Sequence, residues 1–275
     1  MTTLDRTVVV HRDADVLAEA VAARLLTRLV DCQAVRGRAS VVLTGGGVGL
    51  AALAALSRSP ARAAVDWRAV DVWWGDERFL PSGDPDRNET QARTALLDAL
   101  DLEPGRVHPI AGPGPGAGVG AGAGVGVGVG VGVGVGVDSP EQAAELYAQA
   151  LSAAAPPDHE LPPFDVLLLG MGPEGHTASI FPESPAAHDD RLVVGVHGCP
   201  KPPSRRVTLG FRALCAAREV WFVVAGTDKA PAVSMALSGA GRVQLPAAGV
   251  AGTSQTLWLL DEAAASGLPR DLRRR

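Results

Sequence analysis

The sequence predicts a three-layer α/β/α domain built on a doubly wound parallel sheet. Short runs of Val and Leu recur along the chain, and several of them are apolar at every position. Longer segments with helical patterns separate these runs. Strands that are apolar on both faces are typical of a parallel sheet covered by helices on both sides. Of the 275 residues, 47% are hydrophobic, so the chain can bury the core that such a domain needs.

The expected elements alternate in the order that this fold class requires. A first strand at residues 7–10 precedes a long amphipathic helix over residues 13–30, with Asp13 or Asp15 as its N-cap. A later helix is capped by Ser139, has Pro140 in its first turn, and continues to about residue 154. The other strands are expected at residues 40–44, 70–74, 166–169, 193–196, 207–209, 220–224 and 256–260, and the other helices from residue 48 and at residues 88–100, 229–237 and 262–266.

Residues 112–137 do not fit this pattern, because glycine occupies every second position between Ala, Val or Pro. Ordering glycine costs the most backbone entropy, and the small side chains between the glycines offer little burial in return. We therefore expect a flexible surface insertion. It interrupts a single domain that spans residues 1–266, and residues 267–275 are expected to form a disordered, Arg-rich tail.

The composition argues against several other classes of protein. The net charge is −5 and no basic stripe is visible, so nucleic acid is not an expected partner. The chain has no glycine-free apolar run of about 18 residues, so no membrane span is expected. The first residues lack the apolar stretch of a secretory signal. The three cysteines, Cys32, Cys199 and Cys215, lie far apart, which argues against a disulfide framework or a zinc site and favours the reducing cytoplasm.

Four of the expected strands end in glycine-rich polar turns. These turns are Thr44-Gly45-Gly46-Gly47, Gly75-Asp76-Glu77-Arg78, Gly170-Met171-Gly172-Pro173-Glu174-Gly175-His176 and Gly226-Thr227-Asp228-Lys229. In open parallel sheets, ligands bind beyond the carboxyl ends of the strands, so we expect the four turns to form one site. A single turn of this kind is often only a chain reversal, but the four together combine exposed amides with Asp, Arg, His and Lys side chains.

Within this expected site, His176 is the candidate general base. It follows Gly175 at the end of a buried strand, and imidazole titrates close to neutral pH, which suits proton abstraction from water. The free N–H groups of Gly45, Gly46 and Gly47, at the start of a helix, favour an anion such as phosphate. The chain lacks the Gly-x-Ser-x-Gly turn of serine esterases and the His-Glu-x-x-His pattern of zinc hydrolases.

Longer motifs surround these turns. They are Trp74-Gly75-Asp76-Glu77-Arg78 followed by Asn88, then Gly170-Met171-Gly172-Pro173-Glu174-Gly175-His176-Thr177-Ala178-Ser179-Ile180-Phe181-Pro182, then Lys201-Pro202-Pro203-Ser204-Arg205-Arg206-Val207-Thr208-Leu209, and finally residues 226–229 and 258–261. Together they resemble the 6-phosphogluconolactonase family, and the histidine motif is the most specific of them. The similarity runs from about residue 7 to residue 263, apart from the insertion.

The resemblance implies a fold and a reaction. The fold is that of the glucosamine-6-phosphate deaminase and lactonase superfamily, one modified Rossmann-like α/β domain. The reaction is hydrolysis of 6-phospho-D-glucono-1,5-lactone to 6-phospho-D-gluconate, a step of the oxidative pentose phosphate pathway. No metal ion and no cofactor is implied, and the expected partner is a small sugar phosphate. The expected assembly is a monomer or a homodimer.

The resemblance also implies roles for individual residues. His176 would activate the attacking water, Asp76 would orient the base or the sugar hydroxyls, and Arg78 would stabilise charge on the lactone oxygen or hold the phosphate. The phosphate would be bound by the glycine amides, Arg206 and Lys229, while Asn88 would support the Asp-Glu-Arg turn. The full set of implied substrate-binding residues is Thr44, Gly45, Gly46, Gly47, Glu77, Asn88, Glu174, Gly175, Arg206 and Lys229.

Two departures and two alternatives accompany this interpretation. Glu174 stands where family members often carry Asp, and the first turn lacks the second Ser of the common Ser-Gly-Gly-Ser, which puts one hydroxyl contact to phosphate in doubt.

An amino-sugar-phosphate deaminase of the same fold would carry an acid where this chain has Phe181. A sugar-phosphate-sensing domain of a transcription regulator would need a helix-turn-helix and a basic face, and this chain is acidic.

Overall fold

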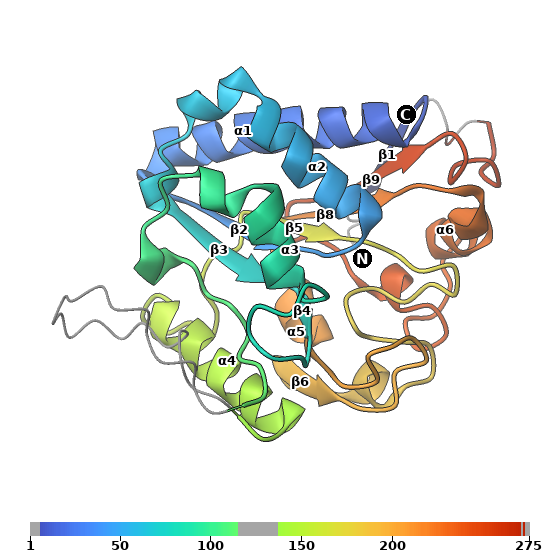
Figure 1. The fold of residues 1–275 in the computed structure, drawn as a ribbon. Helices are drawn as coiled ribbons and strands as arrows, with labels where there is room; N and C mark the ends of the chain where they lie inside the picture. The colour runs from blue at the N-terminus through green and yellow to red at the C-terminus, as the bar shows by residue number, and fades with distance from the viewer. Residues whose placement is uncertain (1–5, 115–136, 271, 273–275) are drawn as a thin grey trace, which may run out of the picture.

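A six-stranded parallel sheet forms the centre of the structure (Figure 1). The computed structural model describes residues 6–114, 137–270 and 272. The strands run in the spatial order β1-β9-β8-β5-β2-β3, and every neighbouring pair is parallel. Their bounds are β1 Arg6–His11, β2 Ala39–Leu43, β3 Val70–Trp74, β5 Val166–Leu169, β8 Glu219–Val224 and β9 Gln255–Asp261.

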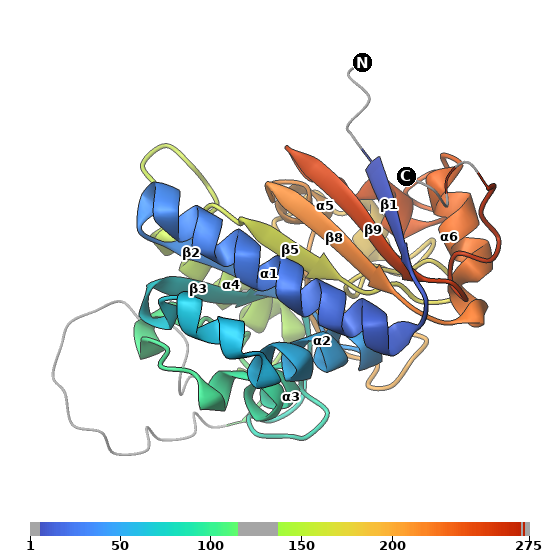
Figure 2. The same cartoon turned by 90° about the horizontal axis from the view of Figure 1, so that it is seen from above.

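Helices and a second, smaller sheet cover the two faces of the parallel sheet. Helices α1 (Ala14–Arg36) and α2 (Gly47–Arg58) run side by side over one face (Figure 2). Helix α4 (Pro140–Ala154) and the short helix α5 (Phe211–Leu214) lie with the second sheet on the opposite face (Figure 1). The remaining helices are α3 Asn88–Ala95 and α6 Ala230–Leu237, with 3₁₀ turns at Pro60–Ala64, Trp67–Ala69, Leu97–Ala99, Pro104–Arg106, Pro185–His188, Thr227–Lys229 and Pro246–Gly249.

The second sheet corrects one expectation from the sequence. Strands β6 (Val193–Val196) and β7 (Arg206–Leu209) were predicted in the parallel sheet, but they pair antiparallel with each other. Strand β4 (Asp76–Arg78), which was predicted as part of a turn, pairs antiparallel with β7. Short Val-rich runs carry no information about strand direction, so the pattern alone could not separate the two sheets.

The helix boundaries agree with the sequence pattern at their capped ends. The Asp13 side chain accepts a hydrogen bond from Val16 N at 2.8 Å, and the Ser139 side chain accepts one from Gln142 N at 3.2 Å, so both predicted N-caps are confirmed. Helix α1 runs six residues past the predicted end at residue 30, and α3 stops at Ala95, before its predicted end at residue 100. Residues 262–266 form turns, so the helix predicted there is wrong.

The structure also corrects the predicted bounds of the insertion and of the C-terminal tail. Gly112 and Val137 were placed in the surface insertion, but both are buried, and Val137 N donates to the Gly112 carbonyl at 3.3 Å. Leu268 was placed in the tail, yet it is only 3% exposed and belongs to the core. The insertion between these ends, residues 115–136, and the tail residues 271 and 273–275 lie outside the described part of the chain.

The core is dense in tryptophan along the sheet. Trp73, Trp74, Trp221 and Trp258 are each at most 1% exposed, and Trp258 stacks on Phe222 with ring centroids 4.2 Å apart. Burial on both faces holds the strands rigidly, so the turns at their carboxyl ends have fixed positions. Among the described residues, the search for a helix long and apolar enough to cross a membrane finds none.

Candidate active site

A cavity of about 420 Å³ opens at the carboxyl ends of the parallel strands. From β2 the chain continues to the edge strand β3, whereas from β5 it continues through β8 to β9 on the other side. The strand order therefore reverses between β2 and β5, where open α/β sheets bind their ligands. The cavity is lined by Thr44, Gly45, Gly46, Gly47, Val48, Gly49, Asp76, Arg78, Asn88, Gly170, Met171, Gly172, Pro173, His176, Ala178, Lys201, Arg206, Val223, Val224, Ala225 and Lys229.

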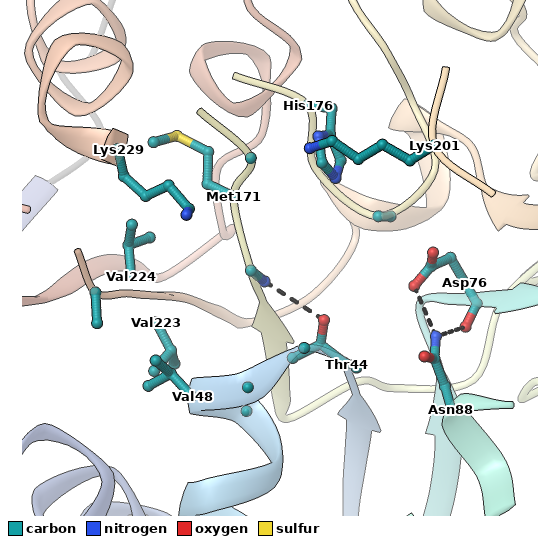
Figure 3. A pocket seen from close by; sticks show the side chains of 18 of the residues that line it. Thr44, Val48, Asp76, Asn88, Met171, His176, Lys201, Val223, Val224 and Lys229 are labelled. Atoms are coloured by element: carbon teal, nitrogen blue, oxygen red, sulfur yellow. Dashed lines mark hydrogen bonds between the residues drawn. The ribbon is translucent and has the colours of Figure 1, made fainter. Parts of the chain in front are cut away.

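His176 lies on the cavity wall with its orientation fixed from two sides (Figure 3). Its Nδ1 atom is 2.8 Å from Oε1 of Glu174, and its ring stacks on Phe181 with centroids 4.5 Å apart. Gly172 makes room for this pair, since a Cβ there would lie 2.1 Å from Nδ1 of His176 and 2.6 Å from Oε2 of Glu174. The carboxylate holds the proton on Nδ1, which leaves Nε2 as the basic nitrogen.

Burial is the main reason why the imidazole of His176 is neutral. Burial lowers the pKa of His176 below its ordinary value, and the positive charge of Lys201 lowers it further. Glu174 and, more weakly, Asp76 act in the opposite direction. Burial raises the pKa of Glu174, but its own backbone N–H and its interactions with His176 and Lys201 outweigh burial, so this pKa lies below its ordinary value. At neutral pH a neutral imidazole therefore faces an ionised carboxylate.

Asp76 presents a carboxylate at the cavity wall from the start of β4. Its Oδ2 accepts a hydrogen bond of 2.6 Å from the Ser179 hydroxyl, and its Oδ1 accepts one of 3.2 Å from Nδ2 of Asn88. Asn88 Nδ2 also donates to the Asp76 carbonyl at 2.9 Å. Asp76 is 5% exposed and Ser179 is fully buried, so this carboxylate is held in a single position. The side chain that contacts the histidine is thus Glu174, whereas the family resemblance implied that Asp76 orients either the base or the sugar hydroxyls.

Glu77 is buried behind the cavity rather than in its wall. Its carboxylate accepts hydrogen bonds from the backbone N–H groups of Arg78, Asn88 and Glu89 at 2.8, 2.7 and 2.8 Å. Burial raises the pKa of Glu77 to about 7, against the opposing effect of Arg87 and these N–H donors. Glu77 therefore fixes the start of α3, and with it Asn88, because it satisfies N–H groups that a helix N-terminus leaves free.

The opposite side of the cavity suits an anion. Helix α2 begins at Gly47, directly after the Thr44-Gly45-Gly46 turn, so its N-terminus faces the cavity. Thr44 accepts a hydrogen bond of 3.4 Å from Gly170 N and keeps its own hydroxyl hydrogen for a ligand. Gly45 packs directly against Asn88, since a Cβ there would lie 2.1 Å from Oδ1 of that side chain. Lys229 lies across the cavity from His176 (Figure 3).

The two arginines of the expected set use their guanidinium groups partly within the protein. Arg78 donates to the carbonyl of Asp86. Arg206 is 8% exposed and donates to the carbonyls of three residues in the preceding loop, Lys201, Pro202 and Pro203. Both arginines line the cavity, so they contribute positive charge to its wall.

The structure brings most of the predicted site residues together. Those that line the cavity are Thr44, Gly45, Gly46, Gly47, Asp76, Arg78, Asn88, His176, Arg206 and Lys229. Three others act from behind the wall: Glu77 through α3, Glu174 through His176, and Gly175 through the turn between them. Ser179 and Lys201 also belong to the site but were not in the predicted set. Lys201 is one of only two lysines in the chain, the other being Lys229, and that scarcity is a signal that sequence reasoning could have used.

A second cavity, of about 610 Å³, lies at the amino-terminal edge of the same sheet, between α4 and the first residues of β2 and β3. Its charged side chains largely pair with one another: Arg36 with Asp165 at 2.5 Å and Arg106 with Asp71 at 2.9 Å. The four glycine-rich turns lie at the other edge, so the smaller cavity is the candidate active site. Within residues 6–114, 137–270 and 272, no group of three or more His, Cys, Asp or Glu side chains is placed to hold a metal ion.

Comparison with known proteins shows the family of this chain. The model of the glucosamine-6-phosphate isomerase/6-phosphogluconolactonase family matches residues 12–258. The chain belongs to this family. A 6-phosphogluconolactonase from Streptomyces coelicolor is 56% identical over 267 residues, covering 96% of this chain and 95% of that protein. One from Mycobacterium tuberculosis is 43% identical and covers 94% of this chain and 96% of its own length.

Solved structures share the fold. The 6-phosphogluconolactonase of Trypanosoma brucei superposes with a TM-score of 0.77 at 26% identity, covering 97% of this chain and all of that one. A monomeric glucosamine-6-phosphate deaminase superposes with a TM-score of 0.73 at 18% identity, covering 95% of this chain and 99% of that one. The predicted family and the predicted α/β fold are therefore confirmed. Because members with two different reactions share it, the fold alone does not choose between them.

Proposed function

We propose that this chain hydrolyses 6-phospho-D-glucono-1,5-lactone to 6-phospho-D-gluconate, with His176 as the general base. The observation that carries the proposal is the Glu174–His176 pair, held at 2.8 Å on the wall of a cavity whose other side suits a phosphate. The relatives of 56% and 43% identity, both named 6-phosphogluconolactonase, cover nearly the whole chain and support the same reaction.

The reaction needs a base, an oxyanion donor and an acid. Nε2 of His176 takes a proton from a water molecule as the water oxygen bonds to the lactone carbonyl carbon. The negative charge that develops on the carbonyl oxygen is stabilised by Arg78. The tetrahedral intermediate then breaks its bond to the ring oxygen, and the imidazolium returns the proton to that oxygen. The product is the open-chain acid, and His176 is neutral again.

Binding at the far side of the cavity sets the substrate in place. The phosphate is bound by the α2 N-terminus with the amides of Gly45, Gly46 and Gly47, by the Thr44 hydroxyl and by Lys229. Asp76 and Asn88 bind the sugar hydroxyls. An anchored phosphate fixes the lactone carbonyl relative to His176, and positioning of this kind supplies a large part of the rate enhancement.

The aromatic neighbour of His176 argues against the deaminase alternative. Phe181 occupies the position where a deaminase of this fold would be expected to carry an acid. Phe181 is 4% exposed and stacks on the His176 ring. An apolar ring there cannot donate a proton for sugar ring opening. The acidic net charge of −5 and the base-like geometry of His176 argue against a sensor that binds without turnover.

The remaining parts of the proposal concern the whole protein. Residues 1–266, extended to at least Leu268, form one lactonase domain, and residues between Gly114 and Val137 are an insertion in it. The protein acts in the cytoplasm as a monomer or homodimer, on a sugar phosphate, without nucleic acid, metal ion or cofactor.

The decisive assay uses freshly generated 6-phosphogluconolactone and subtracts its spontaneous hydrolysis. The purified protein should accelerate loss of the lactone, and it should release no ammonia from glucosamine 6-phosphate. Ammonia release at a rate comparable to lactone hydrolysis would overturn the assignment in favour of the deaminase.

A further inference from the structure

The loop between β6 and β7 brings a second charged group to the catalytic pair. Nζ of Lys201 lies 3.0 Å from Oε1 and 3.1 Å from Oε2 of Glu174. Oε1 is the same oxygen that contacts Nδ1 of His176 at 2.8 Å. One carboxylate therefore connects the lysine with the histidine, and Figure 3 shows Lys201 and His176 side by side at the cavity.

Arg206, the first residue of β7, holds the backbone of this loop. Its Nε donates to the Pro203 carbonyl, and its Nη2 donates to the carbonyls of Lys201 and Pro202, all at 3.2 Å. The guanidinium carbon also lies 5.9 Å above the Phe181 ring, the ring on which His176 stacks. A buried arginine that satisfies three carbonyls of one loop fixes the start of the Lys201 side chain.

The exposure of the Lys201 side chain shows why its loop has to be fixed. The Lys201 side chain is 45% exposed, so packing alone does not hold its ammonium in place. An exposed lysine that pairs with a carboxylate loses side-chain entropy and gains little. The contacts of Arg206 fix the backbone from which Lys201 extends, so only the Lys201 side chain remains to be ordered.

We propose that Lys201 is a positioning residue of the lactone hydrolysis. Arg206 fixes the backbone of the loop that carries Lys201, and the Lys201 ammonium fixes the Glu174 carboxylate against His176. This inference rests on the proposed function for its place in catalysis. It assigns Arg206 chiefly to the loop, whereas the sequence analysis placed Arg206 on the phosphate. Phosphate binding then depends mainly on Lys229 and the α2 N-terminus, on the other side of the cavity.

Removing the lysine charge should change the histidine in a defined direction. The charged groups that act most strongly on His176 are Glu174, Lys201 and Asp76, and Lys201 is the cation among them. Arg78 and Arg206 add positive charge to the wall of the same cavity. Without Lys201 the two carboxylates are opposed less strongly, so His176 should hold its proton to higher pH. The Glu174 carboxylate also loses its second anchor. Lys201→Met should therefore shift the His176 titration to higher pH and lower kcat near neutral pH.

The test compares the two lysines of the chain in an NMR titration of the His176 imidazole, made without substrate. Lys201→Met should move the titration to higher pH, and Lys201→Arg should restore most of the wild-type position. Lys229→Met should leave the titration unmoved but weaken the binding of inorganic phosphate. The inference fails if Lys201→Met leaves the titration in place, or if it weakens phosphate binding as much as Lys229→Met does.

Arg206→Lys tests the second half of the inference. This variant keeps the charge but cannot reach three carbonyls at once, so it should shift the His176 titration in the same direction as Lys201→Met. In a Lys201→Met background it should add little further shift, because it acts through Lys201. Additive shifts would show that Arg206 acts on His176 directly. If Arg206→Lys does not fold, the Lys201 variants alone decide the inference.

These readouts separate the inference from the proposed function. The NMR titration and phosphate binding need no turnover, so they stand even if the wild-type protein fails to hydrolyse the lactone. If the wild type is active and the titrations behave as expected, the pH dependence of kcat/KM should show the same shift for Lys201→Met. An active enzyme with an unmoved pH dependence would overturn the inference alone.

Discussion

The contact between Glu174 and Nδ1 of His176 decides which imidazole nitrogen reacts. A neutral imidazole has one N–H and one basic nitrogen, and the carboxylate selects Nδ1 for the proton. The Phe181 ring then limits rotation of the imidazole. The direction of the basic nitrogen is thus set by two neighbouring side chains from the same turn and its continuation, before any substrate binds.

Replacing the base should affect the chemical step more than binding. His176→Ala is expected to lower kcat by about 10²–10⁴-fold, the typical loss for a general base. Affinity for 6-phosphogluconate should stay nearly unchanged, because the phosphate side of the cavity is intact. The measurements are steady-state kinetics and calorimetric binding, with the melting temperature as the control for folding. A variant within a few-fold of the wild-type kcat would show that another group is the base.

The lowered pKa of His176 predicts the acid side of the pH profile. Activity requires neutral His176, so kcat/KM should fall as the pH drops through the pKa of His176 in the free enzyme. Because burial and Lys201 lower this pKa, the fall should come below the ordinary imidazole value of about 6.5. Glu174→Gln removes a charge that raises the pKa, so it should move the fall to still lower pH. A shift to higher pH in that variant would contradict this account of the charges.

Lys229 gives a third test, on the phosphate side. Lys229→Ala should weaken binding of 6-phosphogluconate far more than binding of unphosphorylated gluconate, since charge-assisted contacts to phosphate are strong. The comparison is made by calorimetry with both ligands on the same preparations. Equal losses for the two ligands would assign Lys229 to the sugar or to the fold instead of the phosphate.

Among the elements, α3 and β4 are held together by the buried carboxylate of Glu77 and by Asn88, which donates to Asp76. Glu77 lies on β4, and its side chain satisfies N–H groups at the start of α3. Sequence reasoning identified the Asp-Glu-Arg turn but assigned Glu77 to the substrate. The sequence shows the glutamate but does not show where its side chain points. Whether the side chain faces the ligand or a helix end depends on pairing between β4 and β7, which lie more than a hundred residues apart along the chain.

Glu77→Gln should therefore destabilise the protein. The amide keeps the size of the side chain, but its NH₂ group now faces at least one backbone N–H that had a carboxylate partner. A buried donor left unsatisfied costs about 1–3 kcal/mol, so the melting temperature should fall by several degrees in differential scanning calorimetry. Glu145→Gln, at an exposed position on α4, is the matched control and should leave the melting temperature unchanged. Equal melting temperatures for the two variants would remove the structural role of Glu77.

At the scale of the whole molecule, the sequence predicted the parallel sheet and the position of the site for one physical reason. Strands buried on both faces are recognisable by composition, and parallel strands place the turns that follow them at one edge. The contributions of β4 and the Lys201 loop were not predictable in this way. They depend on antiparallel pairing between distant segments, which a local pattern does not encode.

The ends of the glycine-rich insertion lead to a prediction about the whole domain. Pro113 and Val137 form a bridge, and Val137 N donates to the Gly112 carbonyl, so the two ends are already side by side in the domain. Replacing residues 115–136 with a short Gly-Ser linker should keep kcat/KM within a few-fold and leave the melting temperature unchanged, because loop-closure entropy depends weakly on length.

The matched control is a deletion that extends into the ends. Replacing residues 112–137 also removes Val137, which is 5% exposed, and its hydrogen bond to Gly112. Losing a buried aliphatic side chain costs about 1.5–3 kcal/mol in transfer free energy. The longer deletion should therefore lower the melting temperature while the shorter one does not. If the shorter deletion lowers either activity or melting temperature as much as the longer one, residues 115–136 contribute to the site or the core, and the insertion is part of the working enzyme.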